Sequence, residues 1–240
     1  YGSPDIRRRF YDGVISKTDA VYIDHLQEFR RILKNRNSLL KDIRDGKKDP
    51  GQLDIWDQML AEKSSVIMTR RNTAAERSLP LFQKAYESIS GYEEIPLIRY
   101  RPSIEGFHAE DVVKDLRKNR KRDILSGTTT SGPQRDDFVI ENNGGREFEY
   151  YASEGQVRMA SVSLKVAEMH MVEEGSGYKP LLLVDDIMSQ LDQRRRHNVV
   201  AFFQGGNQIL FTMVDAAQVE GKGDQERKFV VNEQGRVETR

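Results

Sequence analysis

The chain has 240 residues, of which 37% are hydrophobic and 32% are charged, a composition typical of a folded protein with a highly charged surface. Its 38 basic side chains balance its 38 acidic ones, so only a local patch of charge could indicate a nucleic-acid partner. The absence of cysteine excludes disulfides and thiolate metal sites and fits a cytoplasmic location. The sequence has no apolar run long enough to span a membrane, no zinc-ligand spacing among its four histidines and no nucleophile elbow.

An antiparallel helical hairpin is predicted for the first third of the chain. Apolar side chains recur at helical spacing over residues 18–44 and again over residues 53–89. The segment between them, residues 45–51, is rich in glycine, proline and aspartate, so the two helices should run in opposite directions. Pro80 should kink or split the second helix, and Gly91 should end it.

Basic side chains gather at two places in this region. A turn at residues 2–5 precedes Arg7, Arg8 and Arg9, which are expected either in solvent or on a phosphate or carboxylate. Arg36 belongs to the charged side chains that should line the outer faces of the hairpin, whereas the apolar stripes, Trp56 included, should form its seam.

The middle of the chain predicts strands and a strongly basic helix. A strand is expected at residues 95–100, and a β-hairpin is expected where residues 138–140 and 148–151 flank an Asn-Asn-Gly-Gly turn. The helix predicted over residues 110–122 carries the basic side chains Lys114, Arg117, Lys118, Arg120, Lys121 and Arg122. Such a run is either a solvated helix face or a surface that contacts the phosphate backbone of DNA.

A polar turn opens the next predicted helix, which covers residues 156–173. The turn consists of Ser153, Glu154, Gly155 and Gln156. The free N–H groups and the dipole at a helix start attract an anion such as phosphate. The same residues are also explained if Ser153 is a simple N-cap, so both interpretations stay open.

Two adjacent carboxylates, Asp185 and Asp186, directly follow the apolar run of residues 181–184. That run predicts a fully buried parallel strand, and ligands of open α/β sheets bind at the carboxyl ends of such strands. Two acids at that position suit a Mg²⁺ ligand and a group that activates water for attack on a nucleotide phosphate. The alternative is that they only cap the following helix.

Helices and strands alternate in the last part of the chain. A helix is expected over residues 189–203, a buried strand over 208–213, and a closing hairpin in which 229–231 pairs with 236–238. This order predicts an α/β fold with a parallel sheet covered by helices. The sequence contains no G-x-x-x-x-G-K-[ST] loop, so a nucleotide site built on the two acids would lack its phosphate cradle.

Several motifs together resemble one family. The order of residues 153–156, a helix, 181–186 and then 189–192 is similar to the signature motif, Walker B motif and D-loop of an ABC-type ATPase head. More specifically, the chain resembles the RecF family of bacterial recombination mediators. The motifs that carry this resemblance are Gly2-x-Pro4-x-x-Arg7-Arg8-x-Phe10-x-Asp12, Leu33-Lys34-x-Arg36-Asn37-x-Leu39-Leu40, Ser131-Gly132-Pro133-Gln134-Arg135-Asp136-Asp137 and Leu183-Val184-Asp185-Asp186. Gln134 departs from the family pattern, which usually has histidine there.

The resemblance implies roles for individual residues. Asp185 would hold Mg²⁺, and Asp186 would polarise the water that attacks ATP. The other implied residues, at the γ-phosphate of ATP bound to a second subunit or in the dimer interface, are Ser153, Glu154, Gly155, Gln156 and Asp192.

The resemblance also implies an architecture, that of part of an ABC-type ATPase head with an inserted helical-hairpin arm. Residues 1–13 would end a preceding ATPase lobe, residues 14–92 would form the arm, and residues 93–240 would form the C-terminal lobe. Family members begin with a lobe that carries the phosphate loop. The chain is therefore expected to be the C-terminal part of a longer protein and to be inactive as an ATPase by itself.

The implied function is that of a DNA-dependent ATPase in DNA repair, replication and recombination. ATP and Mg²⁺ would join two copies into a homodimer that holds double-stranded DNA near single-strand gaps, and slow hydrolysis would release it. With RecO and RecR, the family loads the RecA recombinase. The alternative is a non-catalytic DNA-binding or scaffolding module in which the aspartate pair is structural. An ABC-like DNA enzyme with an attached nuclease has less support, because the sequence offers no further acidic metal cluster.

Overall fold

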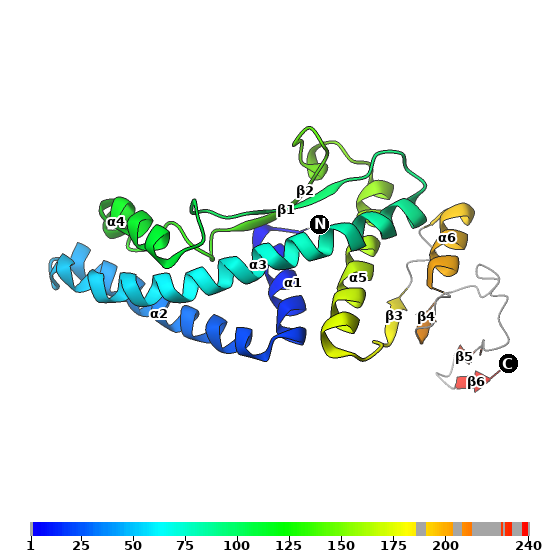
Figure 1. Cartoon of the computed structure of the whole chain (residues 1–240), viewed down its shortest axis with the longest axis horizontal. Helices are drawn as coiled ribbons and strands as arrows, with labels where there is room; N and C mark the ends of the chain where they lie inside the picture. The colour runs from blue at the N-terminus through cyan, green and yellow to red at the C-terminus, as the bar shows by residue number, and fades with distance from the viewer. Residues whose placement is uncertain are drawn as a thin grey trace. The chain divides into compact units, whose positions relative to one another are not determined.

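The structure, a computed structural model, describes residues 2–185, 191–203, 208–212, 227, 229–231 and 237–239. The chain divides into two compact units, residues 1–180 and 181–240. The elements of the first unit are α1 (Pro4–Thr18), α2 (Ala20–Arg44), η1 (Pro50–Gln52), α3 (Leu53–Ser90), β1 (Leu97–Arg101), α4 (Ala109–Ser126), β2 (Asp137–Glu141), η2 (Phe148–Tyr150) and α5 (Glu154–Ser176) (Figure 1). Those of the second unit are β3 (Leu182–Asp185), α6 (Gln193–Phe203), β4 (Ile209–Thr212), β5 (Phe229–Val231) and β6 (Val237–Thr239).

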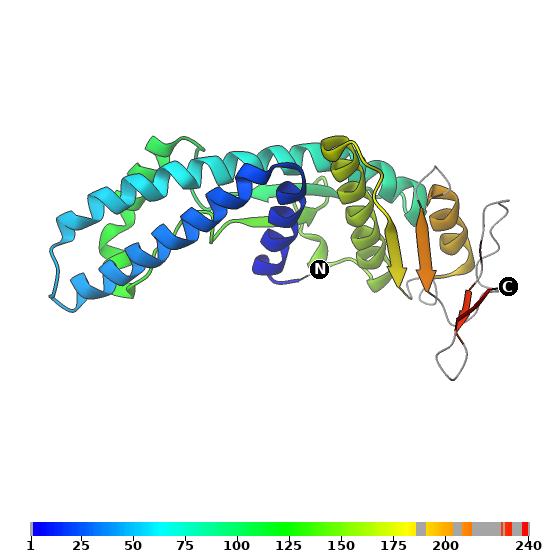
Figure 2. The same ribbon diagram turned by 90° about the horizontal axis from the view of Figure 1, so that it is seen from below.

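The predicted antiparallel hairpin is present as α2 and α3, which lie side by side (Figure 2). Asp19 begins α2, because its side chain accepts a hydrogen bond from the backbone N–H of Tyr22 at 3.2 Å. Gly91 ends α3, as predicted, with a φ of +67° that glycine adopts without strain. Pro80 lies inside α3 and does not split it. Of the two predicted effects of Pro80 the split is therefore not found, and contacts with α1, α2 and α5 hold the long helix together.

The turn predicted at the N-terminus is replaced by α1, which begins at Pro4. Proline is tolerated in the first turn because the N–H that it lacks would have no helical partner there. Arg7 donates to both carboxylate oxygens of Asp137, at 2.9 and 2.6 Å. Arg8 donates to the backbone carbonyl of Asp136 at 2.7 Å. Of the alternatives for this basic cluster, contact with a carboxylate is therefore the one found for Arg7.

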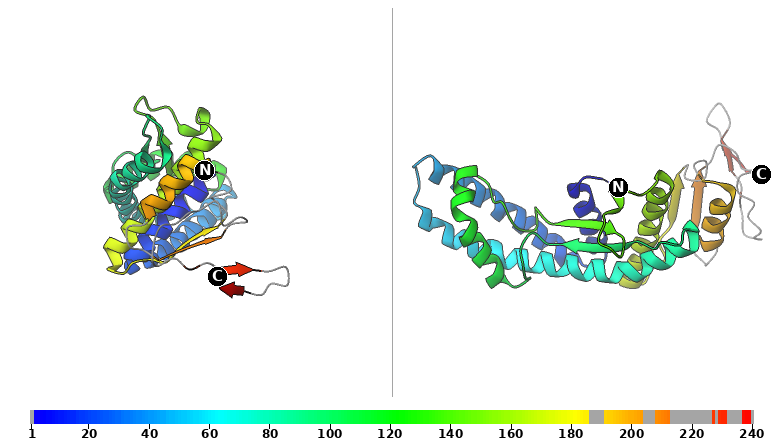
Figure 3. Two further views of the ribbon diagram at one scale, coloured as in Figure 1. Left: turned by 90° about the vertical axis from the view of Figure 1, so that its right-hand side faces the viewer. Right: turned by 90° about the horizontal axis from the view of Figure 1, so that it is seen from above.

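A third helix, α4, lies across α2 and α3 at the end of the hairpin that holds the α2–α3 turn (Figure 3). Buried side chains fill this region, with Trp56 and Ile124 packed against them: Leu39, Leu40, Ile43 and Leu53. The seam position predicted for Trp56 agrees with this packing. The division into residues 1–13, 14–92 and 93–240 stays a proposal; its first boundary falls inside α1, and α4 packs on the hairpin.

Strand β1 pairs with β2 in antiparallel register, with Leu97 opposite Glu141 and Arg101 opposite Asp137. The predicted turn after β2 is present, because the N–H of Gly145 donates to the carbonyl of Asn142 at 2.9 Å and Glu141 forms an antiparallel bridge with Glu147. The second strand predicted at residues 148–151 is wrong, because this segment forms the 3-10 turn η2. The reason is burial of Phe148, which is 0% exposed and meets the ring of Tyr86 on α3 edge-on. The chain turns inward at this aromatic contact and does not continue as a strand.

In the second unit, β3 and β4 form the predicted parallel pair, with Leu183 opposite Leu210. The predicted full burial of β3 is wrong: Val184 is 9% exposed, but Leu183 is 71% exposed and Leu210 is 48% exposed. Successive side chains of a strand point to opposite faces, and within the described residues only one face of this pair is covered. Strands β5 and β6 pair antiparallel, as predicted, and the turn expected between them lies outside the described residues.

Candidate nucleotide-binding elements

The turn of residues 153–156 is a capping box at the start of α5. The hydroxyl of Ser153 accepts from the backbone N–H of Gln156 at 3.3 Å, and the side-chain oxygen of Gln156 accepts from the backbone N–H of Ser153 at 2.9 Å. The N-cap interpretation of Ser153 therefore holds. The first-turn N–H groups of Glu154 and Gly155 have no acceptor within the described part of the chain, as is usual at a helix start. The same turn can thus cap α5 and still present donors to an anion.

Gly155 is also explained by packing. A Cβ atom at this position would lie 3.0 Å from the hydroxyl oxygen of Tyr92, which follows α3. A side chain here would therefore displace Tyr92 or move α5 away from it. Beside the turn, on the first two turns of α5, lies an open depression lined by Ala152, Glu154, Val157, Arg158 and Ser161.

Helix α5 is held firmly against α1 and α3. Its buried side chains include those predicted from the sequence: Met159, Val162, Val166 and Met169. Glu168, predicted to be exposed, instead accepts from Lys17 of α1 at 2.6 Å and from Lys165 at 2.9 Å. Burial alone would raise the pKa of Glu168, but these two hydrogen bonds and the charges behind them hold it below its usual value. The capping box is therefore fixed relative to α1 and α3.

Asp185 lies at the carboxyl end of β3, in the second unit, and its side chain is exposed. Thr212 stands opposite it in the parallel register and donates its hydroxyl to the Asp185 carboxylate. This contact depends on the register of the two strands, so the sequence alone does not indicate it. Asp186, the predicted activator of water, lies outside the described residues.

A magnesium ion fits Asp185 only if a nucleotide completes its coordination. Among the described residues, no cluster of three or more acidic or histidine side chains could hold a metal ion. Mg²⁺ commonly binds through one or two carboxylates, with phosphate oxygens and water as its remaining ligands. One exposed carboxylate, oriented by a neighbouring hydroxyl, suits that mode of binding.

Asp192 is the N-cap of α6. Its carboxylate accepts from the backbone N–H of Arg195 at 2.9 Å and also from the Arg195 guanidinium. These hydrogen bonds, the backbone one first, hold the pKa of Asp192 below its usual range. The helix predicted from residue 189 therefore begins later, at Gln193, because Asp192 supplies the cap.

A buried arginine that the sequence placed on the outer face lies where α4 packs on the hairpin, toward the α2–α3 turn. Arg36 is 0% exposed; it donates to Asp57 of α3 at 2.8 Å and to Asp123 of α4 at 2.9 Å. Thr129 accepts a further hydrogen bond from Arg36 at 2.7 Å. The prediction for Arg36 is wrong because α4, which covers this face, could not be placed on the hairpin from periodicity alone.

A second buried arginine, Arg71 of α3, contacts two further motifs of the family resemblance, the one at residues 2–12 and the one at residues 131–137. It donates to both carboxylate oxygens of Asp12, each at 2.9 Å, and to the carbonyl of Pro133 at 2.6 Å. Asp136 lies 3.6 Å from Arg71 and accepts from the Tyr100 hydroxyl. Burial raises the pKa of Asp136 despite these partners. The spacing of Arg71 on α3 gave a usable signal that we missed, since Arg71 lies four residues after Ile67 on the apolar stripe.

Known proteins that are similar to this chain identify its family. No protein-family model matches the chain. The chain is 34% identical to the DNA replication and repair protein RecF of Rippkaea orientalis, an alignment that covers 98% of the chain and 66% of that protein. It is also 34% identical to RecF of Lactobacillus johnsonii, covering 100% of the chain and 66% of that protein. The chain thus spans about two thirds of the length of these relatives, 66% in both.

Solved structures agree with the sequence matches. The "Structure of the recombination mediator protein RecF-ATP in RecFOR pathway" superposes with a TM-score of 0.84 at 32% identity, covering 99% of this chain and 63% of that one. The corresponding RecF-ATPrS structure gives a TM-score of 0.83 at 33% identity. The fold class predicted from the sequence, an α/β part of an ATPase head with a helical arm, is thereby confirmed. None of the described helices is both long and apolar enough to cross a membrane. With this agreement in sequence and in fold, the chain belongs to the RecF family.

Proposed function

We propose that the full-length protein is an ATP-dependent clamp on double-stranded DNA that acts in repair and recombination. The observation that carries this proposal is the match to RecF proteins over at least 98% of the chain, in sequence and in a fold solved as RecF-ATP. In this proposal ATP joins two copies into a dimer near a single-strand gap, and slow hydrolysis releases them. RecO and RecR are the proposed partners, and loading of RecA is the proposed outcome.

The proposed nucleotide contacts come from two elements. Ser153 and Gly155, at the start of α5, would contact the γ-phosphate of ATP bound to the second copy, because a helix start offers free N–H donors. Glu154 and Gln156 belong to the same turn. Asp192 would lie in the dimer interface. The exposure of Ser153 and the lack of an acceptor for the first-turn N–H groups among the described residues support this assignment.

The proposed catalytic contacts follow β3. Asp185, oriented by Thr212, would hold Mg²⁺, which supplies charge neutralisation at the phosphates when it is bound. Asp186 would orient and polarise the attacking water as a general base. The phosphate-binding loop would come from the part of a RecF protein that this chain does not cover, so we expect no ATP turnover from residues 1–240 alone.

ATP turnover of the full-length protein, measured with and without duplex DNA, tests the proposal. We expect slow hydrolysis that duplex DNA accelerates. In the same protein Asp186→Asn should lower turnover and preserve ATP binding, because the amide keeps the size of the carboxylate but cannot accept a proton. Unchanged turnover in this variant would contradict the assignment of Asp186.

Dimerisation tests the contact at the start of α5 separately. Ser153→Arg should abolish the ATP-dependent dimer in analytical ultracentrifugation and leave ATP binding intact, since a bulky cation at the helix start blocks the approach of the second copy. Ser176→Arg, at the exposed far end of α5, is the matched control and should dimerise normally. A normal dimer with Ser153→Arg would remove Ser153 from the nucleotide contacts.

A non-catalytic DNA-binding or scaffolding module is the second candidate. It is favoured by one observation, that Ser153 and Asp192 both already serve as helix caps within their own chain. Such roles need no nucleotide. Absence of hydrolysis in the full-length protein, with DNA binding indifferent to ATP, would favour this module over the clamp.

A further inference from the structure

We propose that the exposed face of α4 is a contact surface for the phosphate backbone of duplex DNA. The face, called the α4 basic face below, is formed by Lys114, Arg117, Lys118, Lys121 and Arg122, all of which are exposed. The choice of DNA as partner rests on the proposed function, whereas the location on α4 rests on the arrangement of charges in the structure.

Beyond the first turn of α4, which holds Glu110 and Asp111, the two remaining acidic side chains are engaged in hydrogen bonds within the protein. Asp123 is 0% exposed and is held by Arg36 at 2.9 Å. Asp115 accepts hydrogen bonds from Ser131 and, at 3.0 Å, from Asn119. Although acids are interspersed in the α4 sequence, its outer face beyond the first turn therefore carries one sign of charge. That segregation distinguishes α4 from an ordinary solvated helix, in which both signs mix on the surface.

The cations of the α4 basic face are available to a ligand. Within the part of the chain that the structure describes, Lys114, Lys118, Lys121 and Arg122 form no salt bridge, whereas Arg120 forms two. Among the described residues the one α4 cation in a salt bridge is Arg120, which contacts Asp57 at 2.6 Å and Asp54 at 2.5 Å. An exposed lysine or arginine without an ion-pair partner can neutralise a DNA phosphate, which releases a counterion condensed on the DNA and so contributes a large part of the affinity.

The geometry of the face suits a duplex backbone. Lys114, Lys118 and Lys121 follow the spacing of one helix face. From Lys114 to Arg122 the face is about 12 Å long at about 1.5 Å per residue, enough for a few phosphates of a duplex. Helix α4 carries no aromatic residue, so it offers no platform on which unpaired bases could stack. These features favour contact with the backbone of double-stranded DNA.

The face is also held in place before any ligand binds. Arg36 and Arg120 tie α4 to α2 and α3, and the left-handed Gly127 ends the helix beside Arg44 of α2. A Cβ atom on Gly127 would lie 3.0 Å from the Arg44 guanidinium, so α4 approaches α2 closely at this end. A preordered surface loses little conformational entropy on binding.

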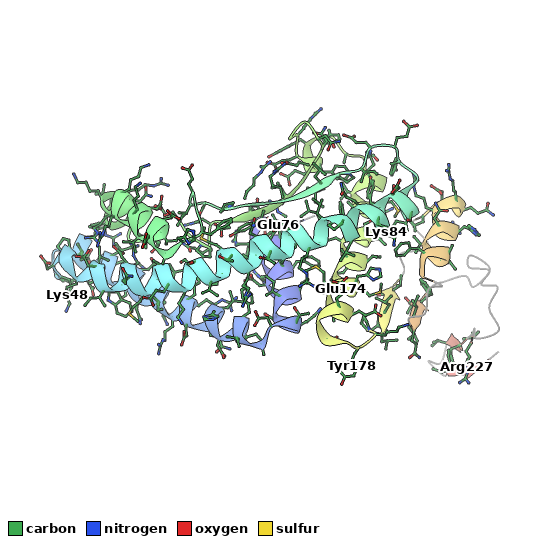
Figure 4. All side chains as sticks on the ribbon, in the orientation of Figure 1. Lys48, Glu76, Lys84, Glu174, Tyr178 and Arg227 are labelled. Atoms are coloured by element: carbon green, nitrogen blue, oxygen red, sulfur yellow. The ribbon has the colours of Figure 1, made fainter. Side chains whose placement is uncertain are left out.

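Binding of the full-length protein to a labelled duplex, followed by fluorescence anisotropy in ATP and Mg²⁺ at several salt concentrations, tests the proposal. Lys118→Glu/Arg122→Glu should weaken binding about tenfold or more and lower the slope of log affinity against log salt by about 2, since each lost phosphate contact contributes about 1. The control is Arg31→Glu/Lys84→Glu, with the same charge change at exposed positions of α2 and α3. Lys84 lies on the part of α3 away from α4 (Figure 4).

Three outcomes would overturn the proposal. Equal losses in the two double variants would mean that only the overall charge matters. Unchanged DNA binding in Lys118→Glu/Arg122→Glu would reassign the face to another ligand, such as an acidic protein surface. A charge-preserving variant, Lys118→Arg/Arg122→Lys, should bind normally; if it fails, the loss comes from folding. Failure of the unmodified protein to bind duplex DNA would contradict the proposed function itself, and the two failures are thereby distinguished.

Discussion

Two sets of motif residues, all of which point to the same family, differ in what they contact. In the motifs on α1, on α2 and in the loop before β2, several charged side chains are buried: Arg36 lies between Asp57 and Asp123, and Asp12 faces Arg71. The motif residues at the starts of α5 and α6 and at the end of β3 face outward. Ser153, Asp185 and Asp192 are all exposed, and each contacts only its immediate surroundings.

The difference separates motif residues that hold the fold from those free to bind. A buried ion pair stabilises little by itself, but removal of one partner leaves a charge without water or a counter-charge. An exposed cap residue loses far less when it is replaced. The two sets should therefore respond in opposite ways to mutation, the inner set in stability and the outer set in activity.

Replacement of Arg71 should give the largest loss of stability. Arg71→Met leaves the Asp12 carboxylate buried without its bidentate partner and removes the cation beside Asp136, so the free energy of unfolding should fall by about 3–5 kcal/mol. Urea unfolding of the full-length protein measures this. The neighbouring Arg70→Met is the control: its bridge to Asp19 is 3.2 Å long on an arginine that is 56% exposed, and its loss should cost less than about 1 kcal/mol. Similar losses at the two positions would mean that the buried site is not special.

Arg36→Met should give the second largest loss of stability, lowering the free energy of unfolding by about 3 kcal/mol. The loss is placed at the lower end because Arg120 remains 2.6 Å from Asp57, which leaves Asp123 as the main unpaired charge. Removal of that charge as well, in Arg36→Met/Asp123→Asn, should recover part of the stability in the same unfolding measurement. A double variant as unstable as the sum of two independent losses would contradict coupling between the two side chains.

The contrast also explains which parts of the fold could be predicted. Periodicity found α2, α3, α4 and α5, and the apolar runs found β3 and β4, because these signals are local to the sequence. The burial of Arg36 could not be predicted, since it depends on α4 packing across the hairpin from far along the chain. The strand predicted at Phe148 failed for the same reason, because its partner Tyr86 is distant in sequence.

In the candidate site, hydrogen bonds within one short segment could be predicted from the sequence, whereas a contact between two strands could not. The residues of the capping box lie within four positions, so their hydrogen bonds could be anticipated as an N-cap from spacing alone. The hydroxyl of Thr212 beside Asp185 could not, because it depends on the register of two strands that are joined by a helix. Local chemistry is therefore visible in the sequence, while contacts between elements need the three-dimensional arrangement.

Ser153→Ala should cost about 1 kcal/mol, much less than either buried arginine, because only one cap is removed. Ser153→Asn should restore that stability, since asparagine caps helices as well as serine does. If Ser153 also contacts ATP, Ser153→Asn should still weaken ATP-dependent dimerisation in analytical ultracentrifugation. A variant that is normal in both stability and dimerisation would place Ser153 with the structural set.

The smallest effect is expected at Glu168, which lies between the two sets with Lys17 and Lys165 on either side. Its folded pKa is below the unfolded value of 4.5, so its stabilisation is complete above that value and is lost as the pH falls through the folded pKa. Asp136 acts in the opposite sense, because its pKa is raised from 3.8 and its contribution to stability becomes more favourable as the pH falls.

Glu168→Gln should therefore cost about 1 kcal/mol or less near neutral pH and nothing in acid, measured as the difference from wild type in the free energy of urea unfolding. Glu174→Gln, on an exposed pair with Arg77, is the control and should show a smaller difference at either pH. A Glu168→Gln difference that persists in acid would mean that packing of the side chain, and not its charge, holds α5 on α1.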